Sequence, residues 1–274
     1  MKKRSFFERV AAIPHIVWTV LFITAPLLFV VFFAFTDRTG QFTLENLLSL
    51  SQYSGTFVMS LGFSLIATTV CLLIGYPLSY CMSKTSPRSR NVLVVLMMLP
   101  TWISLLIRTY SLMALLDNGG IVSGFLVTLG FEKLTFIGTE GAVILGMVYD
   151  FLPYMVLPIY NSVSKLDKRY LEAASDLGCN GFQTLTKVVL PLTVPGIASG
   201  VTMVFVPSIS TFYISQKLGG VDTLLIGDVI EQHYTAANYN MTASLSFVLM
   251  VILIVGLAIV NHYTDSDEGG GMII

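Results

Sequence analysis

Charged residues are scarce in this sequence. They make up 11% of its 274 residues, whereas hydrophobic residues make up 54%. An ordinary soluble domain has roughly 25% charged residues, and a soluble protein of this size cannot cover its surface with so few. The composition therefore excludes a soluble globular protein and predicts a chain that faces lipid over much of its area.

Cysteine is sparse and the common catalytic motifs are missing. Three cysteines, Cys71, Cys81 and Cys179, predict neither a disulfide framework nor a metal cluster. The sequence contains no G-x-x-x-x-G-K-[ST] phosphate loop, no H-E-x-x-H and no G-x-S-x-G, which argues against ATP hydrolysis or hydrolase chemistry by this chain. Its net charge of −1 creates no basic field for nucleic acid. We therefore expect no catalytic residues, no metal and no cofactor.

Long apolar runs are abundant. A helix needs about 20 apolar residues to cross a hydrocarbon core ~30 Å thick. Runs that are continuously apolar over this length favour helices over barrel strands, in which polarity would alternate. The sequence predicts an all-α polytopic membrane protein with one transmembrane domain over residues 1–274. Its six spans are expected at about 12–35, 57–82, 91–116, 141–163, 192–215 and 242–263.

The distribution of Lys and Arg predicts the orientation of these spans. Eleven of the fifteen basic residues lie in the N-terminal tail and in the loops that follow the second and fourth spans. Only three lie in the alternate loops. Because basic loops stay in the cytoplasm, both termini are predicted to be cytoplasmic.

The longest predicted cytoplasmic loop, residues 164–191, has the pattern of two short helices. Asp167 is a suitable N-cap for a helix that extends to Leu177, and Gly178 can adopt the left-handed conformation that ends it. A second helix is expected over Phe182–Val189 and should end at Pro191. A helix–turn–helix at the membrane surface suits the groove of a cytoplasmic partner.

The same loop resembles the signature loop of ABC-importer permeases. An E-A-A triplet, a glycine four residues later and a distal L-P pair are held at the family's spacing, although Val188 replaces the usual isoleucine. The resemblance implies that the loop receives the motion of partner ATPases. The matching positions are Glu172, Ala173, Ala174, Gly178, Leu190 and Pro191.

A narrower resemblance extends over most of the chain. Residues 106–110, 148–155, 165–168 and 224–227 are similar to those of the PotB-type spermidine/putrescine permeases. The resemblance implies a type I ABC-importer permease of MetI-like architecture in the plasma (inner) membrane of a prokaryote, in contact with lipid. It also implies a homologous second permease, two cytoplasmic ATPase subunits and an extracytoplasmic polyamine-binding protein as partners.

Residues predicted near the middle of the membrane also suit a cationic substrate. Asp150 lies ~14 Å deep at helical rise, where a charge costs at least ~2.5–3.5 kcal/mol. A carboxylate beside aromatic faces suits an ammonium group, and the predicted outer side carries eight acids against three bases. Arg108 is expected to reach the outer interface or to pair locally. The predicted substrate path comprises Trp102, Tyr110, Tyr149, Asp150, Tyr154, Ser208, Thr211 and Tyr213.

Alternatives to this interpretation stay open. Asp150 could be a protonated or paired structural acid, and Trp102 could be an ordinary packing residue. The chain could be an ABC permease for another solute, such as a metal complex or a phosphonate, or an ATP-independent channel or membrane scaffold. If Asp150 binds substrate, Asp150→Asn should impair transport while stability holds or rises.

Overall fold

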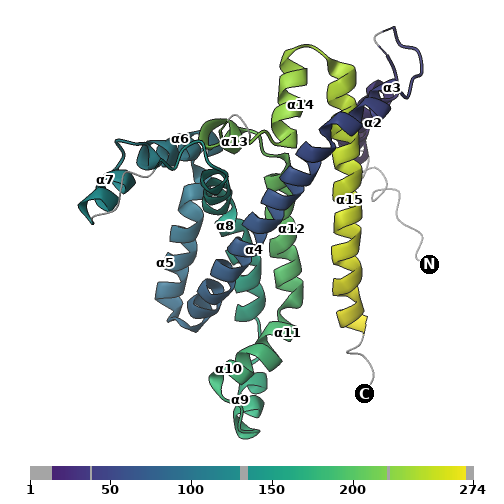
Figure 1. Cartoon of the computed structure of the whole chain (residues 1–274). Helices are drawn as coiled ribbons and strands as arrows, with labels where there is room; N and C mark the ends of the chain where they lie inside the picture. The colour runs from purple at the N-terminus through teal and green to yellow at the C-terminus, as the bar shows by residue number, and fades with distance from the viewer. Residues whose placement is uncertain (1–13, 38, 130–134, 221–222, 270–274) are drawn as a thin grey trace, which may run out of the picture. The chain divides into compact units, whose positions relative to one another are not determined.

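A computed structural model describes residues 14–37, 39–129, 135–220 and 223–269. Within these residues every regular element is a helix, apart from a single bridge between Thr36 and Phe42 (Figure 1). Four helical stretches are long and apolar enough to cross a membrane, or up to six if each of two bent pairs counts as one span. The predicted all-α membrane class is thereby confirmed. Internal contacts divide the chain into two compact units, residues 1–54 with 229–253 and residues 55–228 with 254–274.

The smaller unit joins the first span to the start of the last helix. The Nδ2 atom of Asn240 donates a hydrogen bond to the Thr36 carbonyl at 2.7 Å, and the Ser244 hydroxyl donates to the Ala34 carbonyl at 3.1 Å. These contacts satisfy carbonyls at the end of the first span. The unit contains the helical stretch Pro14–Ala34 with α2 (Ala25–Ala34), then α3 (Glu45–Leu48), most of α14 (Ile226–Thr235) and the first half of α15 (Tyr239–Gly269).

The larger unit is organised around α8 (Glu140–Ser164). This helix packs against five others and buries Met147, Met155, Val156 and Ile159 completely. The other helices of the unit are α4 (Ser54–Lys84), α5 (Pro87–Met98), α6 (Leu105–Leu116), α7 (Ile121–Thr128), α9 (Lys168–Asp176), α10 (Gly181–Thr184), α11 (Leu190–Leu192), α12 (Val194–Ser210) and α13 (Tyr213–Leu218).

Glycines allow α12 to approach α8 closely. A Cβ atom placed on Gly200 would lie 2.8 Å from Met155 Sδ and 3.1 Å from the Met155 carbonyl oxygen. A Cβ atom on Gly196 would meet the side chain of Ser162. The Gly-x-x-x-Gly spacing of the fifth predicted span therefore has the packing role that such spacing has in membrane helices.

The third predicted span is bent within its length, and a second bend separates the loop at 164–191 from the fifth predicted span. Pro87–Trp102 and Leu105–Phe125 meet at 94°, and Gly181–Leu192 and Val194–Ser210 meet at 69°. In the third span, Leu99–Trp102 forms a tight helical turn with Pro100 near its start, and Ile103 is extended. Proline removes a helical hydrogen bond, so a continuous apolar run is compatible with a break that hydropathy does not reveal.

Candidate functional site: a helical loop and a polar interior

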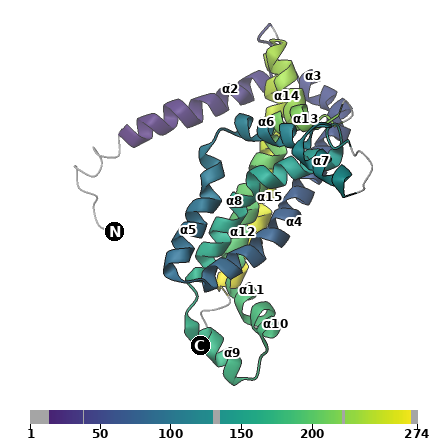
Figure 2. The ribbon, with the colours of Figure 1, turned by 90° about the vertical axis from the view of Figure 1, so that its left-hand side faces the viewer.

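The α9–α10 loop extends from the ends of α8 and α12 in the larger unit (Figure 2). The Asp167 carboxylate accepts a hydrogen bond from the Arg169 amide at 3.0 Å and caps α9. Gly178 follows α9 with a φ of 76°, which glycine adopts without strain. The helix predicted from Leu166 to Leu177 therefore has the expected cap and end, although α9 itself covers Lys168–Asp176.

The second helix of the loop differs from its prediction. Asn180 and Gln183 form a reciprocal capping box at the start of α10. The helical stretch then continues through Pro191 and bends only at Thr193. Leu185–Val189 adopt a π-helical turn before Pro191. The prediction that Pro191 ends the helix is wrong, because the π-helical turn before it changes the hydrogen-bond register and the helix continues to Leu192.

The loop presents both polar and apolar side chains to its surroundings. Glu172, Ala173 and Gly178 are exposed, whereas Ala174 is buried. Two large apolar residues are exposed as well: Leu177 by 84% of its surface and Phe182 by 74%. Sequence reasoning missed both, although an apolar residue on either side of the turn at Gly178 was a usable signal.

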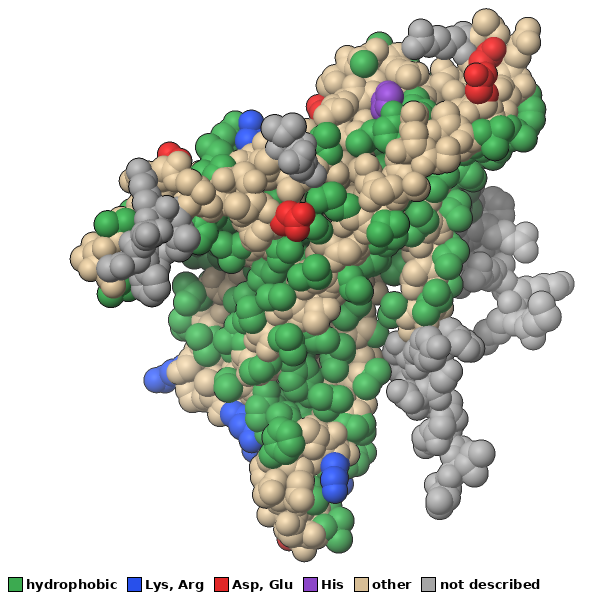
Figure 3. Space-filling model, viewed as in Figure 1, with side chains coloured by type: hydrophobic (Ala, Val, Ile, Leu, Met, Phe, Trp, Pro, Cys, Tyr) green, Lys and Arg blue, Asp and Glu red, His purple; other side chains and the backbone are tan. Residues whose placement is uncertain are grey.

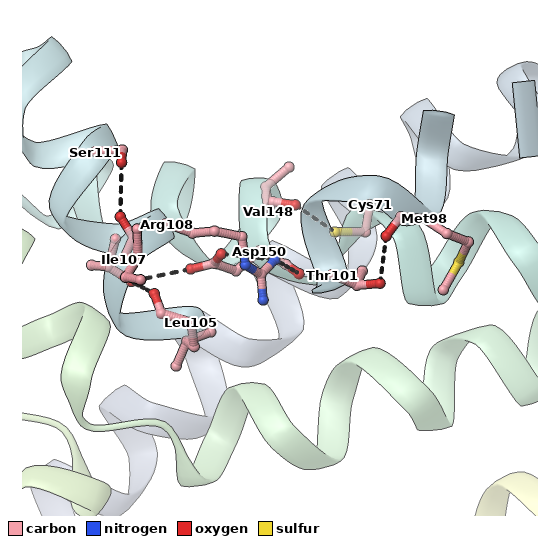
Figure 4. Close-up of polar contacts among 10 residues, drawn as sticks. Cys71, Met98, Thr101, Leu105, Ile107, Arg108, Ser111, Val148 and Asp150 are labelled. Carbon is pink, nitrogen blue, oxygen red and sulfur yellow. Dashed lines mark hydrogen bonds and ion pairs between the residues drawn. The ribbon is translucent and has the colours of Figure 1, made fainter. Parts of the chain in front are cut away.

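Asp150 lies inside the larger unit with a charged partner. It is fully buried, and its Oδ1 atom lies 3.0 Å from Nη1 of Arg108, which is 5% exposed (Figure 4). The same Nη1 donates to the Asp150 carbonyl oxygen at 3.2 Å, and the Thr109 hydroxyl lies 3.3 Å from Oδ2. The pair joins α6 to α8. The contact at Oδ1 is ionic without hydrogen-bond alignment, and Nε of Arg108 is buried without a partner.

Arg108 is therefore placed differently from the expectation. It neither extends to an interface nor pairs with a residue nearby in sequence, because its partner is 42 residues away. The 94° bend before α6 changes the direction of the chain and turns Arg108 and Thr109 toward α8. A straight third span would have given no reason to expect this contact.

The remaining predicted path residues lie in varied surroundings. Trp102 is 74% exposed at the bend between α5 and α6. Tyr149 is exposed and Tyr154 is half-buried, whereas Ser208 and Thr211 are buried near the end of α12.

Two predicted aromatic residues come together on α6 and α13. The rings of Tyr110 and Tyr213 pack edge to face, with centroids 5.8 Å apart. The ammonium group of Lys217 lies 5.3 Å from the Tyr110 centroid and 5.7 Å from the Tyr213 centroid. Sequence reasoning missed Lys217, although it lies one helical turn after Tyr213 and is one of the three bases predicted on the outer side. In this conformation two positions suited to an ammonium group are occupied by cations of the protein itself. Arg108 lies beside Asp150, and Lys217 lies against the two tyrosine rings.

Residues 72–265 match the protein-family model described as "Binding-protein-dependent transport system inner membrane component". The spermidine/putrescine transport system permease protein PotB of Haemophilus influenzae is 39% identical over 258 residues, which cover 90% of each chain. The protein of the same description in Escherichia coli is 37% identical over 260 residues, which cover 91% of this chain and 94% of that protein.

Solved structures show the same fold. A bacterial ABC transporter involved in the import of the acidic polysaccharide alginate contains a chain that matches with a TM-score of 0.78 at 19% identity, over 96% of each chain. The MetNI methionine ABC transporter in an inward-facing conformation matches with a TM-score of 0.55 at 17% identity, over 77% of this chain and 92% of that one. The family match and the PotB relatives, taken with this fold, establish that the chain belongs to the binding-protein-dependent transport system inner membrane components, in the PotB-type spermidine/putrescine permease family.

Proposed function

We propose that this multi-pass inner membrane protein moves polyamines into the cell as one permease subunit of an ATP-driven importer. The observation that carries the proposal is the 37–39% identity, over about nine-tenths of the chain, to permeases named for spermidine and putrescine. The family description names a binding-protein-dependent system, which implies ATPase and binding-protein partners. The finer assembly that we propose has a homologous second permease, two ATPase subunits and an external polyamine-binding protein.

The α9–α10 loop is the contact with the ATPases in this proposal. Its exposed Leu177 and Phe182 flank the turn at Gly178, and their apolar surface suits a groove on a protein partner. Both termini and this loop lie in the cytoplasm, as the positive-inside distribution predicts. Movement of the ATPases then reaches α8 and α12, which the loop connects.

The Tyr110–Tyr213 pair is the part of the proposed path best suited to a polyamine. A substrate ammonium group can replace Lys217 against the two rings, since both are ammonium cations that an aromatic face attracts. Asp150 has a different role in this conformation. Arg108 neutralises it inside the protein, so Asp150 positions α6 against α8 and would meet substrate only after Arg108 is released.

Reconstituted transport tests the substrate. The chain is reconstituted in liposomes with its second permease, ATPases and binding protein, and uptake of spermidine, putrescine, methionine and a phosphonate is measured with and without ATP. ATP-dependent polyamine uptake supports the proposal. ATP-dependent uptake of another solute alone contradicts the substrate, and flux without ATP would support the channel alternative.

Two variants at one position test the aromatic site. Lys217→Gln removes the resident cation and should lower the KM for spermidine, whereas Lys217→Arg retains a cation and should leave the KM nearly unchanged. Tyr213→Leu should raise the KM. A KM that is the same in all three variants would place the polyamine elsewhere.

A further inference from the structure

A basic cleft opens where the ends of four helices of the larger unit meet. It lies between the end of α4, the start of α5, the end of α8 and the start of α9, and its volume is about 640 Å³. Three cationic residues line it, Lys84, Arg90 and Lys168, and Ser83 and Thr85 add hydroxyl groups. We call this site the basic cleft. Figure 3 shows that blue side chains gather at this end of the larger unit.

No acidic side chain of the lining balances the positive charge of the basic cleft, because no Asp or Glu lines it. Neither the Arg108–Asp150 pair nor the Arg169–Asp167 pair involves a cationic residue of the cleft. The Arg90 Nη2 atom donates to the Ser83 carbonyl at 2.7 Å, which orients the guanidinium group. Its Nε atom is buried and has no hydrogen-bond partner. Because no carboxylate of the lining neutralises the three cationic side chains, the cleft suits an anion.

The depth of the basic cleft indicates what kind of anion it meets. Lys84 ends the helical stretch Glu45–Lys84, and Ser164, which also lines the cleft, ends α8. Both stretches are candidate spans, so the cleft lies at the level where helices leave the membrane. This level contains lipid headgroups, and the cytoplasmic leaflet is rich in anionic lipids. Apolar side chains, including Val163, Leu166 and Val189, also line the cleft.

A second, apolar groove continues along α5 from the same end. It is lined by Asn91, Val92, Val95, Leu96 and Leu99 and has a volume of about 320 Å³. Residues four apart lie on one face of a helix, so Pro87 of the basic cleft is in line with Asn91, Val95 and Leu99. A ligand with a phosphate head and a long apolar tail would match the basic cleft followed by the apolar groove.

We propose that the basic cleft binds the phosphate of an anionic phospholipid, whose acyl chain follows the apolar groove on α5. Lys84 and Lys168 provide charge, and Arg90 provides the directed N–H donors. Because Lys168 is the first residue of α9 while Lys84 ends α4, the bound headgroup connects the α9–α10 loop to the spans. The proposal does not depend on the transported solute. It uses only the cytoplasmic orientation of the loop.

Lipid retention by the assembled transporter tests the proposal. The complex that contains this chain is reconstituted in phosphatidylcholine with a minor fraction of phosphatidylglycerol, then extracted, and the bound lipids are measured by mass spectrometry. The double variant K84Q/K168Q should retain roughly ten-fold less phosphatidylglycerol than the unmodified chain. The matched control R88Q/K165Q removes two exposed charges from the same end outside the cleft and should change retention by less than about two-fold. R90K keeps the charge but loses the planar guanidinium donors, so its retention of phosphatidylglycerol should lie between that of K84Q/K168Q and that of the unmodified chain.

Three other results would overturn the proposal. An equal loss in both double variants would mean that retention reflects diffuse surface charge. Binding of inorganic phosphate to the unmodified complex, measured by phosphorus NMR, without any retained phosphatidylglycerol would identify a free anion as the occupant. Loss of ATPase co-purification in K84Q/K168Q with unchanged lipid retention would show that the cleft holds an acidic segment of a protein partner.

Discussion

The α9–α10 loop and the α6–α8 interior both depend on polar side-chain contacts. In the loop the contacts join residues close in the sequence, whereas in the interior they join residues far apart in it. In the loop, Asp167 caps α9 through an amide two residues away, and Asn180 caps α10 through one three residues away. In the interior, Arg108 and Asp150 pair across 42 residues. The loop is therefore built from local rules, whereas the interior depends on two helices meeting at one angle. Changes in the interior should alter stability, and changes in the loop should alter partner binding.

The largest effect is expected from Arg108→Leu. Removal of one member of a buried ion pair leaves an uncompensated charge and should lower the free energy of unfolding by about 3–5 kcal/mol. Thermal unfolding of the purified complex measures the change. The double variant R108L/D150L serves as the control and should recover most of the loss, since paired apolar substitutions are often neutral. Equal losses in the single and double variants would contradict the pairing role.

The Arg108–Asp150 pair reverses the stability change that the sequence predicts for Asp150→Asn. Sequence reasoning predicts that stability holds or rises, since a buried charge is removed. With Arg108 as its neighbour, the substitution leaves a buried guanidinium group unpaired, so we now expect stability to fall. Thermal unfolding of this variant beside R108L/D150L distinguishes the two expectations. Unchanged stability with impaired transport would favour direct contact of Asp150 with substrate.

A smaller effect is expected from Gly200→Ala. The added Cβ atom would lie 3.1 Å from the Met155 carbonyl oxygen and closer still to Met155 Sδ, so α8 and α12 must separate slightly. The free energy of unfolding should fall by about 1–3 kcal/mol. Gly62→Ala is the matched control because no neighbouring atom lies within 4 Å of its added Cβ. If both substitutions cost the same, close packing at Gly200 is not the cause.

In the loop, L177S/F182S should change stability by no more than about 0.5 kcal/mol. Both side chains are exposed, so the fold loses little. Co-purification of the ATPases should nevertheless be lost, and with it ATP-dependent uptake. Leu129→Ser removes an exposed apolar side chain that follows α7 and should leave co-purification intact. Full co-purification of L177S/F182S would place the ATPase contact elsewhere.

The smallest effect on structure is expected from single cysteine substitutions at exposed positions, whose labelling reports the orientation of the chain in the membrane. Ser89 and Asn118 are both exposed, so either Ser89→Cys or Asn118→Cys should be tolerated. In intact cells an impermeant thiol reagent should label the variant at position 118 and not the variant at position 89. Cys81 and Cys179, which are not fully buried, are replaced by serine in both variants. The reverse pattern would place the α9–α10 loop outside the cytoplasm and separate it from the ATPases.

Local signals in the sequence predicted much of the loop. Asp167 and Gly178 have strong positional preferences at helix ends, and these preferences act within a few residues. The same reasoning failed at Pro191, because a π-helical turn lets the helix continue. The roles assigned to Glu172 and to the substrate path stay predictions. The interior was harder to predict, because the break near Trp102 in an apolar run has no hydropathy signal.

The sequence by itself determined the membrane class, the number of apolar runs, the family and the local structure of the loop. Each of these depends on composition or on residues a few positions apart, where apolar length and capping preferences act directly. Only the tertiary structure decided that Arg108 neutralises Asp150, that Lys217 lies against Tyr110 and Tyr213, and that three basic residues from different helices share one cleft. These contacts depend on the angles at which helices bend and pack, because ionic and aromatic interactions at a few ångströms join residues far apart in the chain.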